Sequence, residues 1–203
     1  MIGIIDINTG NLTSIYNALN SIGFESKIIN PDSIKSNYSH IILPGVGNFF
    51  ETMKFNKKKD YVKSILNFAI TGKPILGICL GMQLMGTYSE ETKKTDGFNL
   101  IPGRTVAFKN VPVPHVGWNN VIYQKDSFLF NEIKNNGDFY FVHSYFFITD
   151  KQEYIIATSE YKKINFASVI RKNNVIGCQF HPEKSQKNGL RFLKNFCSWR
   201  GLC

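Results

Sequence analysis

The chain has 203 residues and carries 24 basic against 15 acidic side chains, which gives a formal net charge of +9. An apolar content of 43% with 14% aromatic residues excludes a disordered chain and is typical of a globular protein. The charge does not predict a nucleic-acid partner, because the lysines stand in scattered short runs without interleaved aromatic residues. We expect a solvated surface, or a basic face that meets an acidic partner or a phosphorylated metabolite.

The sequence also limits the cellular setting that we expect. Residues 1–6 contain no basic segment of the kind that opens a signal peptide, and no apolar run approaches the length of a membrane span. The cysteines show neither paired metal-ligand spacing nor a disulfide framework; they are Cys79, Cys178, Cys197 and Cys203. We therefore expect a cytoplasmic protein without membrane contact or a metal site, folded as one domain over residues 1–203.

The first part of the chain predicts strands and helices in alternation. Apolar runs predict buried strands at residues 1–7, 26–29, 40–43 and 74–78. Helical spacing of apolar residues predicts helices at 11–22, 60–71 and 80–85. This alternation is the signature of a parallel sheet flanked by helices, whose ligands bind beyond the carboxyl ends of the strands.

From about Gly97 the pattern changes toward strands. They are predicted at residues 105–109, 119–123, 138–143, 154–158, 167–171 and 175–180. Asn173-Asn174 predicts a tight hairpin turn between the last two, and residues 189–199 predict a closing helix. We expect an α/β fold with a central, mostly parallel sheet and an additional antiparallel strand region in the C-terminal half.

One short segment places a thiol between two glycines at the end of an apolar run. Gly77 and Gly81 flank Cys79 and supply the small neighbours that a nucleophile elbow needs. A helix that begins after Cys79 would direct its N-terminal N–H groups at the sulfur, favour the thiolate and offer the Leu80 N–H to an oxyanion. The alternative for a single cysteine in an apolar run is a buried core thiol.

A second segment, Gln179-Phe180-His181-Pro182-Glu183, supplies a base for that thiol. His181 and Glu183 are two residues apart, so they point to the same side of an extended segment. Glu183 can then hold one ring nitrogen of His181 while the other nitrogen takes the thiol proton. Cys79, His181 and Glu183 form the predicted catalytic triad.

These residues resemble a known family. Gly77-Ile78-Cys79-Leu80-Gly81-Met82-Gln83 with His181-Pro182-Glu183 is similar to the class I glutamine amidotransferases, which release ammonia from glutamine. Further segments resemble the glutaminase subunits of imidazole glycerol phosphate synthases, over nearly the whole chain; they are residues 43–47, 115–119, 141–145 and 181–185. The resemblance implies the three-layer fold of this family and a glutaminase that needs no metal or organic cofactor.

The loop after the strand at 40–43 is expected to complete an oxyanion hole. It carries Gly45, Val46 and Gly47, and parallel strands should bring it to the same sheet edge as Cys79. The Val46 N–H is then a second oxyanion donor beside that of Leu80. The alternative is a glycine-rich turn without chemistry.

The resemblance also implies the residues that hold glutamine. Glu91 matches the acidic residue of the family near the glutamine site, and Gln83 matches the side chain at the amino-acid end of the substrate. Gly47 and the backbone groups of Ser144 and Tyr145 complete this set. For Gln83 and Glu91 the alternative is a solvated position on a helix or loop.

The resemblance leaves no part of the chain for binding an ammonia acceptor, so it implies a partner subunit. In this family the partner is a cyclase, a barrel protein that uses ammonia to convert the phosphorylated ribulosyl intermediate PRFAR into imidazole glycerol phosphate and an aminoimidazole ribotide. The expected assembly is a heterodimer for histidine biosynthesis. Asn11, Trp118 and Lys184 match family positions near the interface.

One departure keeps other functions open. The segment Asp6-Ile7-Asn8-Thr9-Gly10-Asn11 lacks the Tyr-Gly that usually follows the aspartate in this family. A paralogue that supplies ammonia to a sugar-modifying synthase is one alternative, and a thiol hydrolase acting alone is another. The complete set of triad residue types counts against a non-catalytic binding module.

Overall fold

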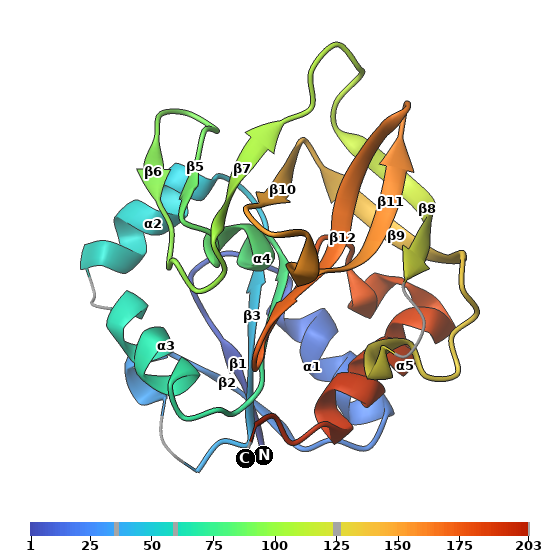
Figure 1. Cartoon of the computed structure of the whole chain (residues 1–203). Helices are drawn as coiled ribbons and strands as arrows, with labels where there is room; N and C mark the ends of the chain where they lie inside the picture. Colours follow the sequence, from blue (N-terminus) through green and yellow to red (C-terminus); the bar gives the residue numbers. More distant parts are fainter. Residues whose placement is uncertain (35–36, 59–60, 124–126, 203) are drawn as a thin grey trace.

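The computed structural model describes residues 1–34, 37–58, 61–123 and 127–202 (Figure 1). Its main sheet has a parallel half and an antiparallel half. In spatial order, the parallel strands are β2 (Ser26–Ile29), β1 (Ile2–Ile5), β3 (His40–Gly45), β4 (Ile75–Cys79) and β13 (Val175–Cys178). The antiparallel strands continue from β13 as β12 (Ile164–Lys172), β11 (Ile155–Tyr161), β8 (His115–Tyr123) and β9 (Gly137–His143). Most of the predicted antiparallel region is therefore an extension of the parallel sheet, whereas the strand predicted at 105–109 lies in a second sheet.

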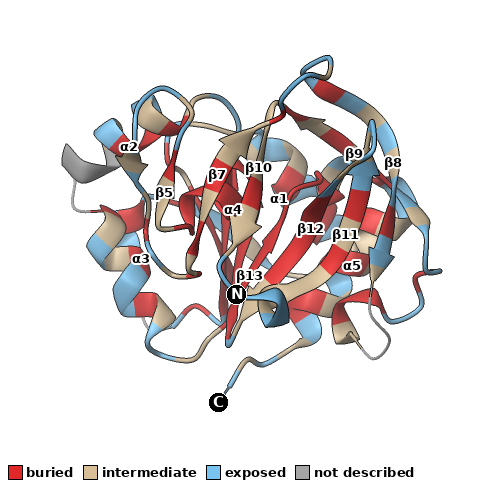
Figure 2. Ribbon diagram, turned by 45° about the horizontal axis from the view of Figure 1, so that its top comes forward, coloured by how far each residue is buried: buried red, intermediate tan, exposed pale blue. Residues whose placement is uncertain are grey.

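Helices lie on both faces of the parallel half (Figure 1). They are α1 (Leu12–Ser21) and α5 (Gln186–Ser198) on one face, and α2 (Phe49–Lys58) and α3 (Tyr61–Ala69) on the other. Adjacent residues of β3 point to opposite faces, so Ile42 packs in the core beside α1 and α5 while Ile41 packs beside α2 and α3. Both faces of β1, β3 and β4 are buried, which explains their continuous apolar sequence (Figure 2).

A second, smaller sheet lies near the carboxyl end of the parallel strands (Figure 1). It is ordered β10 (Tyr145–Thr149), β7 (Gly103–Ala107), β5 (Tyr88–Ser89) and β6 (Thr95–Asp96). Only Ser144 separates β9 of the main sheet from β10 of the second sheet. The chain therefore changes sheets at a single residue.

Local sequence explains the ends of the helices. Asn11 caps α1, because its side-chain oxygen accepts a hydrogen bond of 3.2 Å from the Ser14 N–H. Gly23 follows the helix with a φ of +83°, a left-handed conformation that favours glycine. The predicted helix 60–71 is present as α3, although Asp60 lies outside the described residues.

Most elements lie where the sequence predicts them, and some do not. The strands predicted at 26–29 and 40–43 are present as β2 and β3, and the hairpin at Asn173-Asn174 connects β12 and β13. The helix α2, the strand β10 and the two-residue strands β5 and β6 were not anticipated. Among the described residues, no helix combines the length and the apolar character that crossing a membrane requires.

Candidate active site

The chain makes a strained turn at Cys79, where β4 ends and the short helix α4 (Leu80–Leu84) begins. Cys79 has φ 53° and ψ −109°, which is an unfavourable conformation for a residue with a side chain. A Cβ on Gly77 would lie 2.6 Å from the carbonyl atoms of Gly81, and one on Gly81 would collide with the Leu43 carbonyl oxygen. The two glycines are therefore required by close packing, as a nucleophile elbow predicts.

The Cys79 side chain is buried, and its sulfur has two polar neighbours. The sulfur lies 3.7 Å from the carbonyl oxygen of Val142 and 3.6 Å from Nε2 of Gln179. As a thiol it can donate to Val142, and as a thiolate it can accept from Gln179. Because α4 is only five residues long, its main contribution is the Leu80 N–H next to the sulfur.

His181 and Glu183 form a buried pair. The Nδ1 atom of His181 lies 2.8 Å from Oε1 of Glu183, and the two side chains are 3% and 2% exposed. Backbone bonds hold the segment, since the His181 N–H donates to the Tyr140 carbonyl and the Ser185 hydroxyl donates to the His181 carbonyl. The Nε2 atom of His181 has no hydrogen-bond partner among the described residues. It is therefore available for the proton of a thiol.

Opposing effects act on the charge of His181. Burial disfavours the imidazolium, but the neighbouring sulfur of Cys79 and the carboxylate of Glu183 stabilise it more. The net result is that the pKa of His181 is raised above its usual value. The site thus favours a proton on the imidazole, so the ring can hold the positive charge that develops when it takes the thiol proton.

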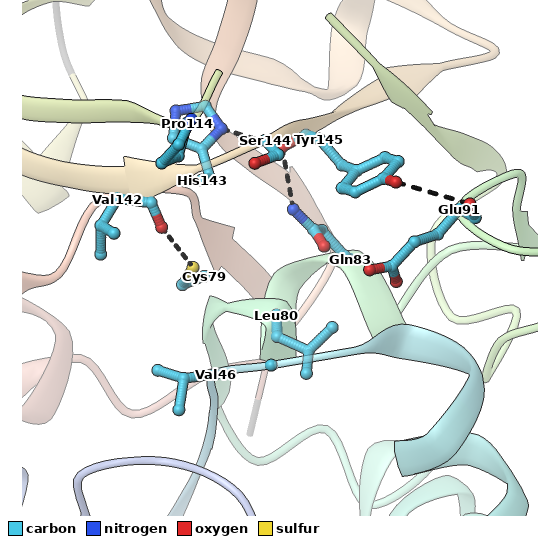
Figure 3. A pocket seen from close by; sticks show the side chains of 11 residues that line it. Val46, Cys79, Leu80, Gln83, Glu91, Pro114, Val142, His143, Ser144 and Tyr145 are labelled. Carbon is cyan, nitrogen blue, oxygen red and sulfur yellow. Dashed lines mark hydrogen bonds between the residues drawn. The ribbon is translucent and has the colours of Figure 1, made fainter.

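A cavity of about 300 Å³ opens beside the sulfur (Figure 3). It brings together the predicted nucleophile, oxyanion donors and substrate-binding residues, which are Val46, Gly47, Cys79, Leu80, Gln83, Glu91, Ser144 and Tyr145. Pro114, Val142 and His143 also line it, and the sequence analysis gave none of them a substrate-binding role. The expected shared edge is present because Gly45 of β3 is paired with Cys79 of β4.

Glu91 reaches across this cavity to the start of α2. Its Oε2 atom accepts a hydrogen bond of 2.6 Å from the Phe49 N–H, and burial raises the pKa of its carboxyl group. The Tyr145 hydroxyl donates to the Glu91 carbonyl at 3.4 Å. Glu91 therefore places a carboxylate in the cavity and also holds the helix that follows the Val46 loop.

Gln83 is oriented by the protein. Its Nε2 atom donates to the Tyr145 carbonyl at 3.0 Å and to Oε1 of Gln179 at 3.1 Å. With both amide hydrogens used in this way, Gln83 can offer a ligand only its Oε1 acceptor. Gln179 received no role in the sequence analysis, although it precedes His181 by two residues and so shares its side of an extended segment.

The residues matched to the partner interface lie on adjoining elements. Trp118 of β8 is 49% exposed and packs edge-on against Tyr140 of β9. The Tyr140 N–H donates to the Ser185 hydroxyl, next to the exposed Lys184. Asn11 is exposed at the start of α1, which packs against the 3-10 turn Pro182–Lys184.

Comparisons with known proteins agree with this geometry. The family model described as glutamine amidotransferase class-I matches residues 3–198. The subunit HisH of imidazole glycerol phosphate synthase from Desulfitobacterium hafniense is 40% identical over 200 residues, which cover 98% of this chain and 94% of that protein. The corresponding subunit from Caldanaerobacter subterraneus subsp. tengcongensis is 43% identical over 197 residues, which cover 97% of each chain.

Solved structures with lower sequence identity share the fold. The structure of PurLQS from Thermotoga maritima aligns with a TM-score of 0.78 at 18% identity and covers 97% of this chain and 96% of that chain. A glutamine amidotransferase from the same organism aligns with a TM-score of 0.64 at 20% identity and covers 97% and 81%, respectively. The chain belongs to the class I glutamine amidotransferase family and, within it, to the HisH subunits.

Proposed function

We propose that the chain is the glutaminase subunit of an imidazole glycerol phosphate synthase, and that it hydrolyses glutamine at Cys79 and passes ammonia to a cyclase subunit. The observation that carries this proposal is the buried His181–Glu183 pair beside a strained cysteine at the mouth of a cavity. The similarity to HisH subunits over nearly the full length favours this acceptor over a sugar-modifying synthase.

The reaction proceeds through a covalent intermediate. His181 takes the proton of Cys79, and the sulfur attacks the side-chain amide carbon of glutamine. The N–H groups of Leu80 and Val46 stabilise the negative oxygen that develops. His181 then gives its proton to the leaving ammonia, and a water molecule, deprotonated by the same imidazole, hydrolyses the thioester. Glu183 orients the imidazole and stabilises its positive charge throughout.

The opposite end of the cavity suits the charged groups of a free amino acid. The carboxylate of Glu91 binds the substrate ammonium, and Oε1 of Gln83 accepts a second hydrogen bond from it. The backbone groups of Gly47, Ser144 and Tyr145 complete the binding of glutamine. In this assignment the ammonium of glutamine lies away from the Cys79 sulfur, and the side-chain amide of glutamine lies next to the sulfur.

The cyclase docks on the face that carries Asn11, Trp118 and Lys184. Exposed apolar side chains on one face of β8 support this assignment, because such patches mark interaction surfaces; they are Val116, Trp118 and Ile122. The two subunits form a heterodimer in which ammonia passes directly to the acceptor. A direct transfer protects ammonia from protonation by water at neutral pH.

The test is glutamine turnover by a Cys79→Ala variant. We expect a loss of at least about 10³-fold, since removal of the nucleophile leaves only the binding groups and the oxyanion donors. Cys197→Ala is the matched control and should keep its activity, because Cys197 lies in α5 and does not line the cavity. Substantial turnover by Cys79→Ala would reject the proposed nucleophile.

A further inference from the structure

Two buried glutamines connect the sulfur of Cys79 to a backbone carbonyl. Gln83 donates from Nε2 to the Tyr145 carbonyl, which can only accept. This contact fixes the Gln83 amide, so its other hydrogen points to Oε1 of Gln179. Gln179 must then turn its own Nε2 toward Cys79, at 3.6 Å from the sulfur. The orientation of an N–H donor at the nucleophile is thus determined by a distant carbonyl group.

A pair of histidines extends from the same carbonyl. His143 donates from Nδ1 to the Tyr145 oxygen at 2.8 Å, and its Nε2 atom lies 2.9 Å from Nδ1 of His115. The Nε2 atom of His115 lies 3.2 Å from Nδ2 of Asn119, which also donates to the Glu160 carbonyl at 2.8 Å. Because the Tyr145 carbonyl can only accept and the Asn119 amide nitrogen can only donate, each histidine donates from Nδ1 and accepts at Nε2.

This arrangement requires that both histidines are neutral. A protonated His143 would carry a hydrogen on Nε2, where it would meet the Nδ1 hydrogen of His115. Burial lowers the pKa of His115 to about 4 and that of His143 to about 3. The two rings are therefore poor candidates for proton transfer near neutral pH, and their hydrogen bonds have a fixed direction.

We infer that Gln179 is a positioning residue for the nucleophile, which stabilises the Cys79 thiolate through its N–H donor, and that the His115–His143 pair keeps this donor in place. An N–H bond to an anionic sulfur is stronger than one to a neutral thiol, so it favours the reactive form. The role goes beyond the triad, because Gln179 neither takes the proton nor forms a bond to substrate. It rests on the proposed function only in taking Cys79 as the nucleophile.

Other titratable groups also act on the sulfur, and the test must keep them unchanged. His181 and Cys178 interact with the sulfur directly, Glu183 interacts with both of them, and His143 and Glu91 line the same cavity. A Gln179→Met variant alters none of them. It keeps the approximate length of the side chain and removes both its donor and its acceptor.

The experiment measures the rate at which iodoacetamide alkylates Cys79 in the full chain between pH 5 and 9, by mass analysis of the Cys79 peptide. For Gln179→Met we expect the acid limb of the rate profile to move up by about one pH unit, with about a tenfold slower reaction on that limb. Gln83→Met should move it in the same direction by less, because Gln179 is still present but free to rotate. His115→Phe should move it by less again, because it removes only the partner of the His143 ring. Gln152→Met makes the same substitution at an exposed site and should not move it.

Thermal unfolding of each variant shows that it is folded. If Gln179→Met fails to fold, Gln83→Met carries the same test, because it releases the Gln179 amide without removing it. An unchanged profile in the folded Gln179 or Gln83 variant would overturn the role of the amide. An unchanged profile in His115→Phe would overturn the role of the histidine pair. Alkylation reports sulfur reactivity without glutamine, so these outcomes differ from a failure of the proposed glutaminase activity.

Discussion

The backbone conformation of Cys79 lowers the stability of the fold, and it persists only because the surrounding residues hold it. A positive φ in a residue with a side chain costs about 1–3 kcal/mol, and the rest of the fold must offset it. Here β4 on one side and α4 on the other are fully buried, so the strained residue cannot relax without disturbing the core. The strained conformation holds the sulfur at the cavity, where it can attack a bound substrate.

The two supporting residues of the triad should differ in importance. We expect His181→Ala to lower glutamine turnover by about 10⁴-fold, because the variant has no group to take the thiol proton. Glu183→Gln should lower it by about 10²-fold, since an amide oxygen can still accept the Nδ1 hydrogen now bound at 2.8 Å but carries no charge. Turnover of both variants at saturating glutamine measures this order. A more severe loss in Glu183→Gln would show that the charge, and not the proton transfer, limits the reaction.

A glutamine analogue with an electrophilic carbon should label Cys79 selectively. Burial raises the pKa of the Cys178 thiol and that of the Cys197 thiol, so both stay protonated and unreactive near neutral pH. Cys79 has His181 beside it and opens onto the cavity. Peptide mapping after labelling measures the distribution, and an adduct mainly on Cys178 would move the active site elsewhere.

At the scale of elements, the elbow depends on the contact between α4 and β3. We expect Gly81→Ala to lower the free energy of unfolding by about 3 kcal/mol or more, because the new methyl group meets the Leu43 backbone, which cannot move aside. Denaturant unfolding measures the change. Gly23→Ala is the matched control, since a Cβ there meets no atom within 4 Å and only the positive φ is disfavoured, at about 1 kcal/mol. Equal losses in the two variants would show that the Leu43 backbone can move aside and that packing does not require Gly81.

The elements differ in how well local sequence predicts them. Strands buried on both faces, such as β3 and β4, are continuous apolar runs and were located correctly. The strand β10 was missed because only Ser144 separates it from β9, and the change from one sheet to the other depends on contacts with β7. The helix α2 was missed because it is rich in lysine and has no clear apolar face. Its first N–H groups donate to the side chains of Asn48 and Glu91. Glu91 is 42 residues away from Phe49 in the sequence, so this cap has no local signal.

The same distinction applies to the candidate site. Cys79, His181 and Glu183 could be chosen from sequence because a nucleophile, a base and an acid have characteristic neighbours and spacing. Gln179 could not be given a role, since its amide is oriented by a carbonyl 34 residues away, through Gln83. Contacts between distant segments of this kind have no local signal.

At the scale of the whole molecule, the Val46 loop is held at both ends and free between them. On one side Gly45 is paired with Cys79, and on the other Asn48 and Glu91 fix the start of α2. Between them Gly47 has a φ of +104°, and a Cβ there would meet no atom within 4 Å. The chain can therefore turn at Gly47 when the Gly45–Val46 peptide rotates, and this peptide carries the Val46 N–H, so its rotation would switch an oxyanion donor on or off.

We expect the isolated chain to hydrolyse glutamine slowly. A cyclase subunit with its phosphorylated ligand should accelerate the hydrolysis by about 10²–10³-fold, which is the change in rate that one oxyanion donor produces. The physical route begins at Lys184, whose backbone N–H donates to the His181 carbonyl at 3.0 Å. A contact from the Lys184 side chain to the partner thus acts directly on the segment that holds the catalytic base. Glutamine turnover by the chain alone, with the cyclase, and with the cyclase and its ligand measures the activation.

Lys184→Ala should weaken this activation or the assembly itself and leave the alkylation of Cys79 unchanged, because the exposed side chain does not contribute to the cavity. Lys27→Ala is the matched control, since it removes the same charge from β2 at the far edge of the main sheet. For the unaltered chain, equal turnover alone, with the cyclase, and with the cyclase and its ligand would reject the synthase assignment. Activation by a different subunit would instead indicate a different acceptor. A loss of activation in Lys184→Ala with full activation in Lys27→Ala would connect docking to the His181 segment, since net charge is altered equally in both variants.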